Sequence, residues 1–387
     1  SRPWFVARAD RITVGRRATV RYVMRRLLQF IPTLVFVSFL IFAMVDLAPG
    51  DAVDHLVGMQ EGATQSQVEA MRQELGLDRP FPIRLLDWYG QILRGDLGES
   101  IAYRGTPVAE LIGERWPVTF AITAVSLIVA LVVGIGIGVL AALRQGSPAD
   151  PLLMALALFF VSMPHFWFGL ILIILFGVKL RWLPIGGYVP LTESPTEFFR
   201  HMILPCTVLG LVYAGMIARI TRTSVLEVLN LDYVQTARAK GLRQRTVIMR
   251  HALRNALIPL STVIGISIGA MLGGAVITET VFNIRGLGRL IVDGILYRDF
   301  PVVQGGLLVV AVVLGIIVGV FAALHHGRPT DLVLTALALF FVSMPHFWLG
   351  LFMIVLFGVK LRWLPIGGYV PIAENPVEFL RHMILPC

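Results

Sequence analysis

The sequence predicts an all-α integral membrane protein, and three observations lead to that class. Hydrophobic residues make up 56% of the 387 positions and the mean hydropathy is +0.78, too apolar for a soluble domain. Several apolar runs exceed the ~18–20 residues that a helix needs to cross a bilayer. Basic residues gather at the ends of these runs and in the loops between them, where they set the orientation of membrane helices.

Six apolar runs are long enough to span a membrane, and together they define a transmembrane core over residues 27–324. They are about 27–47, 118–143, 152–178, 202–220, 256–281 and 302–324. Residues 1–26 are rich in arginine, which predicts a cytoplasmic N-terminus and a multi-pass protein. Residues 52–116 are polar, with more acids than bases, and are expected to form a small extracytoplasmic insert.

Glycines in the second run predict close helix packing. Gly134, Gly136 and Gly138 lack side chains that would hold a neighbouring helix at a distance.

The composition argues against nucleic-acid binding and against catalysis by this chain. The net charge of +9 comes from membrane ends and loops, so it indicates topology and lipid contact. Neither a phosphate-binding G-x-x-x-x-G-K-[ST] loop nor a metal-binding H-E-x-x-H or paired C-x-x-C motif occurs. Cys206 and Cys387 suggest neither a disulfide framework nor a metal site. We therefore expect no catalytic residues, no cofactor and no metal.

A basic segment at residues 225–255 lies between the fourth and fifth runs. Its arginines and lysine outnumber its acids, which places it in the cytoplasm. Gly241 interrupts a helical pattern and predicts a turn between two short helices. An ordinary basic loop held at anionic headgroups is the simpler interpretation.

Several motifs resemble one family. LDYVQTARAKGL followed by RHALRNALIP is similar to the coupling loop of ABC importer permeases, especially the dipeptide/oligopeptide/nickel branch. LAPGD and LGLDRPFPIRLLDWYGQILRGDLGES resemble the same branch, and the similarity covers roughly residues 20–314. One departure is His251-Ala252-Leu253-Arg254, which stands where the general importer pattern has I-x-L-P.

The resemblance implies a six-span permease core in a bacterial inner (plasma) membrane. It also implies a second homologous permease subunit, two cytoplasmic ATPase subunits and an extracytoplasmic solute-binding protein. The coupling loop of the family fits a groove on the ATPase. The residues implied for that contact are Tyr233, Thr236, Ala237, Ala239, Lys240, Gly241 and Leu242.

Five further residues are candidates for the transport pathway or its gate. Pro164 should kink the third span, and His165 beside it lines the pathway or is a packed histidine. Glu279, near the outer end of the fifth span, pairs, reaches water or takes part in gating. Gly286 and Gly288 form a tight turn that resembles the start of a re-entrant element in the family.

The C-terminal part of the sequence repeats an earlier part. Residues 322–387 match 141–206 at a constant offset of 181, and similarity begins near Gly315. Beyond the sixth span, residues 325–387 form a partial repeat that adds a seventh helix, about 334–359. Because the copies differ at several positions, the repeat suggests a fusion of two permease genes or an assembly error.

The sequence therefore favours the permease of a binding-protein-dependent ABC importer for peptides or related solutes such as nickel chelates. The alternatives are an ion-driven secondary transporter and a non-functional fusion product. The secondary transporter requires charged or broken helices at mid-membrane, for which Pro164 and His165 are the main candidates.

Overall fold

The computed structural model describes residues 31–46 (except 33), 69–73 (except 71), 76–103, 105–324 and scattered later positions. Residues 74 and 75 also lie outside this description. The chain divides into two compact units. The first contains Glu110–Val292 and a stretch that begins at Val313; the second contains described residues within Leu27–Ala109 and Asp293–Val312.

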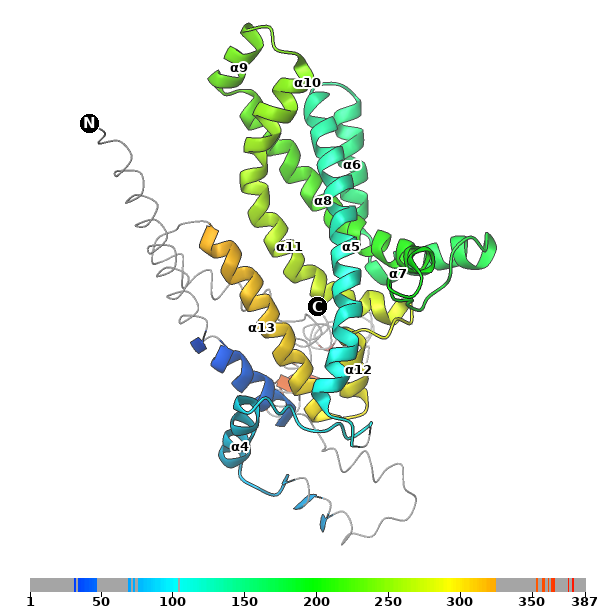
Figure 1. Cartoon of the computed structure of the whole chain (residues 1–387), viewed down its shortest axis with the longest axis vertical. Coiled ribbons are helices and arrows are strands. Elements are labelled where there is room, and N and C mark those ends of the chain that lie inside the picture. The colour runs from blue at the N-terminus through cyan, green and yellow to red at the C-terminus, as the bar shows by residue number, and fades with distance from the viewer. Residues whose placement is uncertain are drawn as a thin grey trace, which may run out of the picture. The chain divides into compact units, whose positions relative to one another are not determined.

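The first unit is a bundle of long helices. Its elements are α5 (Val108–Leu143), α6 (Ala149–Ser162), α7 (His165–Leu172), the π-helical η1 (Ile173–Lys179), α8 (Pro195–Leu229), α9 (Asp232–Ala239), α10 (Gln244–Thr246), the π-helical η2 (Val247–Ala252), α11 (Leu253–Val281) and the start of α12 (Leu287–Leu296). In Figure 1, α5, α6, α8 and α11 run side by side, with α9 and α10 at one end and α12 at the other.

Among the described residues, three helices are long and apolar enough to cross a membrane: α5, α8 and the segment Val247–Val281. α6 and the helix that follows it are a fourth candidate if the bent pair is one span. The helices Leu34–Asp46 and Phe300–Ile316 are apolar but shorter over their described lengths. The predicted count of six spans thus remains a prediction, and the predicted seventh span lies outside the described continuous chain.

The boundaries of α5 and α8 differ from the predicted spans. α5 begins at Val108, so the helix passes through Pro117 and includes part of the predicted extracytoplasmic insert. α8 begins at Pro195, where Ser194 caps it by accepting a hydrogen bond from the Glu197 amide, 3.4 Å away. The added residues include charged and polar side chains, and hydropathy marks only the apolar middle of each helix. The extensions were therefore not predicted.

The third predicted span is broken rather than kinked. The axes of Ala149–Ser162 and His165–Lys179 differ by 100°. Met163 is extended, with φ −78° and ψ 129°, because the ring of Pro164 disfavours helical geometry in the preceding residue. Proline also lacks an amide hydrogen, so the helix cannot continue its hydrogen bonds through this position.

α8 lies at the centre of the bundle and contacts its neighbours through glycines. A Cβ on Gly134 or Gly138 of α5 would lie 2.7 Å from the Ala214 carbonyl oxygen or 2.5 Å from that of Ala218. On the other side, a Cβ on Gly215 of α8 would overlap the Ala157 carbonyl of α6. The prediction of close packing is confirmed for Gly134 and Gly138, whereas Gly136 faces open space.

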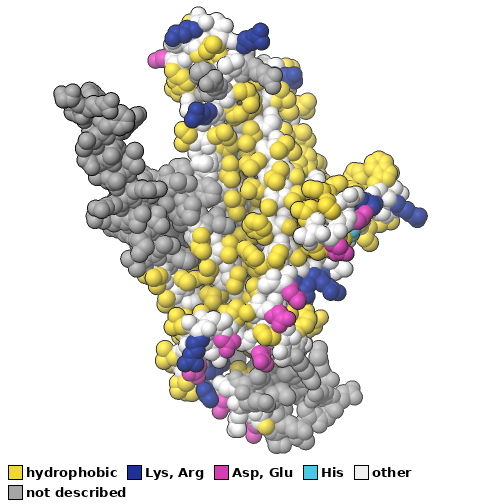
Figure 2. Space-filling view, viewed as in Figure 1, with side chains coloured by type: hydrophobic (Ala, Val, Ile, Leu, Met, Phe, Trp, Pro, Cys, Tyr) yellow, Lys and Arg dark blue, Asp and Glu magenta, His cyan; other side chains and the backbone are white. Residues whose placement is uncertain are grey.

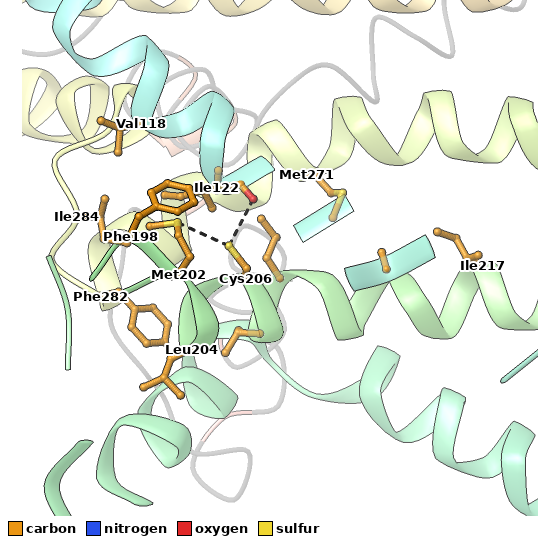
Figure 3. Close-up of a cluster of buried hydrophobic side chains, with 14 of the residues drawn as sticks. Val118, Ile122, Phe198, Met202, Leu204, Cys206, Ile217, Met271, Phe282 and Ile284 are labelled. Carbon is orange, nitrogen blue, oxygen red and sulfur yellow. Dashed lines mark hydrogen bonds between the residues drawn. The ribbon is translucent and has the colours of Figure 1, made fainter. Parts of the chain in front are cut away.

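The buried core follows α8 towards α11 and α5. Figure 3 shows Phe198, Met202 and Cys206 of α8 among Val118 and Ile122 of α5. The Cys206 thiol lies 3.7 Å from the Ile122 carbonyl oxygen and 3.9 Å from the Met202 sulfur. Its environment is that of a packed, space-filling thiol, as expected of a buried cysteine.

The second unit contains the helix Leu34–Asp46, helix α4 (Phe81–Leu93) and the beginning of α13 (Phe300–Leu324). Helix α4 packs against Leu34–Asp46 through Trp88 and Phe42, whose ring centroids are 5.3 Å apart, and Arg84 pairs with Asp46. The buried Asp299 accepts hydrogen bonds from the Ser100 hydroxyl and from the Ala102 amide, the latter at 3.0 Å.

The glycine contacts of α5 generate a testable prediction. We expect Gly138→Ala to destabilise the protein by about 1–3 kcal/mol, because the added methyl overpacks a helix contact. Gly136→Ala is the matched control, since it adds the same methyl where nothing lies within 4 Å. Thermal unfolding of both variants in detergent measures the difference, and equal midpoints would contradict the close α5–α8 contact.

Candidate functional site

The short helix α9 is anchored to the bundle by two side chains one turn apart. Val234 has no exposed surface and Ala237 is 6% exposed. They belong to a buried cluster formed by the ends of three long helices and η2: Ala142, Val225, Leu229, Val247, Ala252 and Ala256. α9 therefore packs directly on the ends of α5, α8 and α11.

The other face of α9 and the turn after it are exposed. Of the predicted coupling residues, six are exposed: Tyr233, Thr236, Ala239, Lys240, Gly241 and Leu242. Ala237 is the exception, because it points into the bundle. Figure 2 shows Lys and Arg side chains gathered at this end of the unit, where Arg238, Lys240 and Arg243 are exposed.

Sequence reasoning missed the anchoring role of Val234. The signal was present, since Val234 and Ala237 are apolar and three residues apart in an otherwise polar helix. It also missed the contact that holds Tyr233, whose hydroxyl accepts a hydrogen bond from the Asn255 side-chain amide at 2.6 Å.

Gly241 forms the predicted turn between α9 and α10. Its φ is +73°, a left-handed conformation that glycine adopts without strain. Its amide donates to the Arg238 carbonyl at 2.9 Å, and no atom lies within 4 Å of a Cβ built on it. Within this chain, the backbone conformation rather than crowding is what requires glycine here.

Glu279 lies at the far end of α11 and is completely buried. Its carboxylate accepts a hydrogen bond from the Thr119 hydroxyl of α5 at 2.5 Å and another from the Arg289 amide at 2.9 Å. The Thr119 oxygen in turn accepts from the Leu287 amide at 2.8 Å. Of the three roles considered for Glu279, the structure thus shows pairing, within a site we call the Glu279 cluster (Thr119, Glu279, Gly286, Leu287, Gly288 and Arg289).

Gly286 and Gly288 are brought to this carboxylate. A Cβ on Gly286 would overlap the Glu279 carboxyl group, and one on Gly288 would lie 3.1 Å from Oε2 and 2.7 Å from a Val276 methyl. Because these residues are glycines, the first turn of α12 can approach the carboxylate closely. The N-terminus of a helix carries a partial positive charge, which stabilises the negative charge of the carboxylate. The sequence did not predict the contact between Thr119 and Glu279, because a single hydroxyl within an apolar run does not indicate which residue it will bond.

Pro164 and His165 lie apart from the Glu279 cluster, at the break between α6 and α7. The His165 ring centroid is 6.4 Å from that of Tyr213 on α8. A Cβ on Gly274 of α11 would lie 3.7 Å from the His165 ring and 3.6 Å from the Tyr213 hydroxyl. His165 Nδ1 is buried and has no hydrogen-bond partner within the described part of the chain. No group of acidic, histidine or cysteine side chains suited to a metal occurs among the described residues.

Comparison with known proteins identifies the family. The family described as "Binding-protein-dependent transport system inner membrane component" matches residues 134–318, and the family of its N-terminal part matches residues 19–123. The chain belongs to this family. It is a component of a transport system rather than an enzyme, and it is a multi-pass protein of the inner membrane.

Two curated relatives agree with this assignment. A probable peptide ABC transporter permease of Sinorhizobium fredii is 42% identical over 290 residues, covering 75% of this chain and 92% of its own length. A di/tripeptide transport system permease of Pseudomonas aeruginosa is 43% identical, with the same two coverages. An inward-facing methionine ABC transporter structure aligns over 56% of this chain and 98% of its own, with 20% identity and a TM-score of 0.45.

For this transport component, the Glu279 cluster predicts a specific stability difference. Thr119→Val removes one of the hydrogen bonds to the Glu279 carboxylate and leaves the Leu287 amide without its Thr119 acceptor. Each buried group that loses a partner costs ~1–3 kcal/mol. Thr123→Val is the control, because among the described residues the Thr123 hydroxyl bonds only the Thr119 carbonyl of its own helix, at 2.8 Å. We expect the Thr119 variant to unfold at a clearly lower temperature in detergent. A larger shift for Thr123 would contradict the role assigned to the cluster.

Proposed function

We propose that this chain is the permease of a binding-protein-dependent ABC importer that carries peptides or related small solutes such as nickel chelates. The observation that carries the proposal is the family match over residues 19–123 and 134–318. Relatives named as peptide permeases, 41–43% identical and matched over 92% of their lengths, support the peptide cargo. In the working complex, a second homologous permease subunit pairs with this one, two ATPases bind inside and a solute-binding protein docks outside.

In this proposal α9 is the coupling helix. Its exposed face contacts the ATPase, while Val234 and Ala237 carry the motion into the bundle. Ala237, proposed from sequence as part of the ATPase contact, becomes an anchor instead. When ATP closes the ATPases together, α9 moves and the ends of α5, α8 and α11 move with it. ATP, bound to the ATPases, thereby selects one of the two conformations of the permease bundle.

The Glu279 cluster is the proposed gate at the opposite end. α11 has 29 residues, so its ends are roughly 43 Å apart at 1.5 Å per residue. A gate at this end must separate α12 from Glu279 and Thr119, or move them together as one body. Pro164 and His165 contribute to the pathway through the break between α6 and α7.

The orientation is proposed from the arginine-rich residues 1–26 and the basic loop 225–255, both placed in the cytoplasm. Single cysteines at Asp96 and Gln244, both exposed, test it in intact cells. An impermeant thiol reagent should label the Asp96 variant and spare the Gln244 variant until the cells are opened. The reverse pattern would invert the proposed topology.

Gly241 provides the test of coupling. We expect Gly241→Val to abolish solute uptake, because a β-branched residue strains a left-handed turn by about 1–2 kcal/mol or more and distorts the face of α9. Gly241→Asn is the matched control, since asparagine tolerates this conformation. Both variants should reach the membrane in equal amounts.

The measurements are uptake of radiolabelled dialanine and copurification of the ATPase subunits. We expect Gly241→Val to lose both uptake and ATPase copurification, and Gly241→Asn to retain both. Normal uptake with Gly241→Val would mean that this turn does not transmit the ATPase motion. Failure of the unsubstituted chain to copurify with any ATPase would refute the proposed function itself.

A further inference from the structure

An ion pair between a buried aspartate and a half-buried arginine joins α6 to α8 near the α9 end of the bundle. The Arg222 guanidinium donates from Nε to Asp150 Oδ1 and from Nη2 to Oδ2, both at 2.6 Å. The Asp150 side chain is 8% exposed and that of Arg222 is 27% exposed. Two parallel hydrogen bonds fix the orientation as well as the distance of the two side chains.

The pair lies beside the buried cluster that holds α9. Asp150 is in the first turn of α6, directly after the turn that leaves α5. Arg222 precedes Val225 and Leu229 on α8, and these two side chains pack with Val234 and Ala237 of α9. The pair therefore ties α6 to the same turns of α8 that support α9.

α6 leads from this end towards the other candidate site. It ends at the break before Pro164, and α7 continues from there. A Cβ on Gly169 of α7 would lie 3.1 Å from Val281 and 3.3 Å from Phe282, at the end of α11 that carries Glu279. A displacement of α6 along its axis would thus reach the neighbourhood of the Glu279 cluster through α7.

Stability alone does not explain a largely desolvated ion pair at this position. Desolvating two charges costs nearly as much as their attraction returns, and a well-packed apolar pair often holds helices equally well. What the forked pair adds is a fixed register between two helices, because sliding by one turn would break both hydrogen bonds.

From this geometry we propose that Asp150 and Arg222 are positioning residues that lock α6 to the coupling end of α8, so that movement of α9 is passed through α6 to α7. The proposal rests on the proposed function, because it assumes that an ATPase moves α9. It assigns no contact with solute or ATPase to either residue.

The experiment uses the complete transporter in nanodiscs, with a reporter cysteine replacing the exposed Phe166 on α7. Both native cysteines are replaced, and the rate of N-ethylmaleimide labelling is measured before and after trapping with ATP and vanadate. The variants are Asp150→Asn, Arg222→Gln, Arg222→Lys and the double variant Asp150→Asn/Arg222→Gln. The control is Glu197→Gln/Arg200→Gln, which removes an exposed pair from the other end of α8.

The double variant separates a positioning role from a stabilising one. Arg222→Gln leaves the buried Asp150 carboxylate without its partner, and Asp150→Asn does the same to the half-buried Arg222 guanidinium. Both should lower stability, whereas the double variant leaves no unpaired charge and should regain it. We expect trapping to change the labelling rate about fivefold or more in the parent and in the control, in the range typical of coupled sites. The double variant and Arg222→Lys should keep ATPase binding and ATP hydrolysis but lose most of that change.

Three results would overturn the proposal. An unchanged labelling response in the stable double variant would leave the pair with a stabilising role only. Loss of ATPase copurification in that variant would place its effect at docking. If the reporter transporter without further substitutions binds and hydrolyses ATP but its labelling rate does not change on trapping, motion does not reach α7. If the parent binds no ATPase at all, the proposed function fails, which copurification reveals independently of the labelling.

Discussion

The structure depends on how helices associate in lipid, where burying apolar surface against a neighbour gains little over burying it in acyl chains. Association must then come from close backbone approach and from polar contacts. α8 uses both, since Gly134 and Gly138 bring α5 against it, Gly215 brings it against α6, and Arg222 pairs with Asp150 of α6. The central position of α8 in the first unit follows from these few contacts rather than from general hydrophobicity.

The same constraint explains why charged groups in the bundle are informative. A carboxylate within an apolar helix is costly unless it is hydrogen-bonded, and both Asp150 and Glu279 are. Asp150 fixes α6 to α8 near α9, whereas Glu279 holds α5, α11 and α12 together at the far end. The two carboxylates thus define two regions in which helix positions are fixed by directional bonds, with the α6–α7 break between them.

The fold class, the position of the basic segment and the turn at Gly241 could be predicted from sequence because each depends on local properties. Apolar length identifies spans, charge asymmetry identifies loops, and glycine identifies a left-handed turn. The pairing of Thr119 with Glu279, 160 positions later, could not be predicted, since nothing local records a partner that distant. The severity of the break at Pro164 was also missed, because proline alone is compatible with a modest kink or with a 100° turn. Burial of Ala237 follows from the register of α9, which a family motif does not specify.

If the Glu279 cluster is the gate proposed above, its polar bonds limit the ways in which it can move. A tightly packed apolar contact loses energy gradually as it separates, whereas a buried hydrogen bond either exists or leaves its donor and acceptor unpaired at a cost of ~1–3 kcal/mol. The Thr119–Glu279–Leu287 connection is all-or-none in this sense. If α12 separates from the carboxylate during transport, water or another donor must replace the lost hydrogen bonds. If nothing replaces them, α5, α11 and the start of α12 must move as one body. The glycines at 286 and 288 favour the second course, because they let the backbone approach so closely that little room remains for sliding.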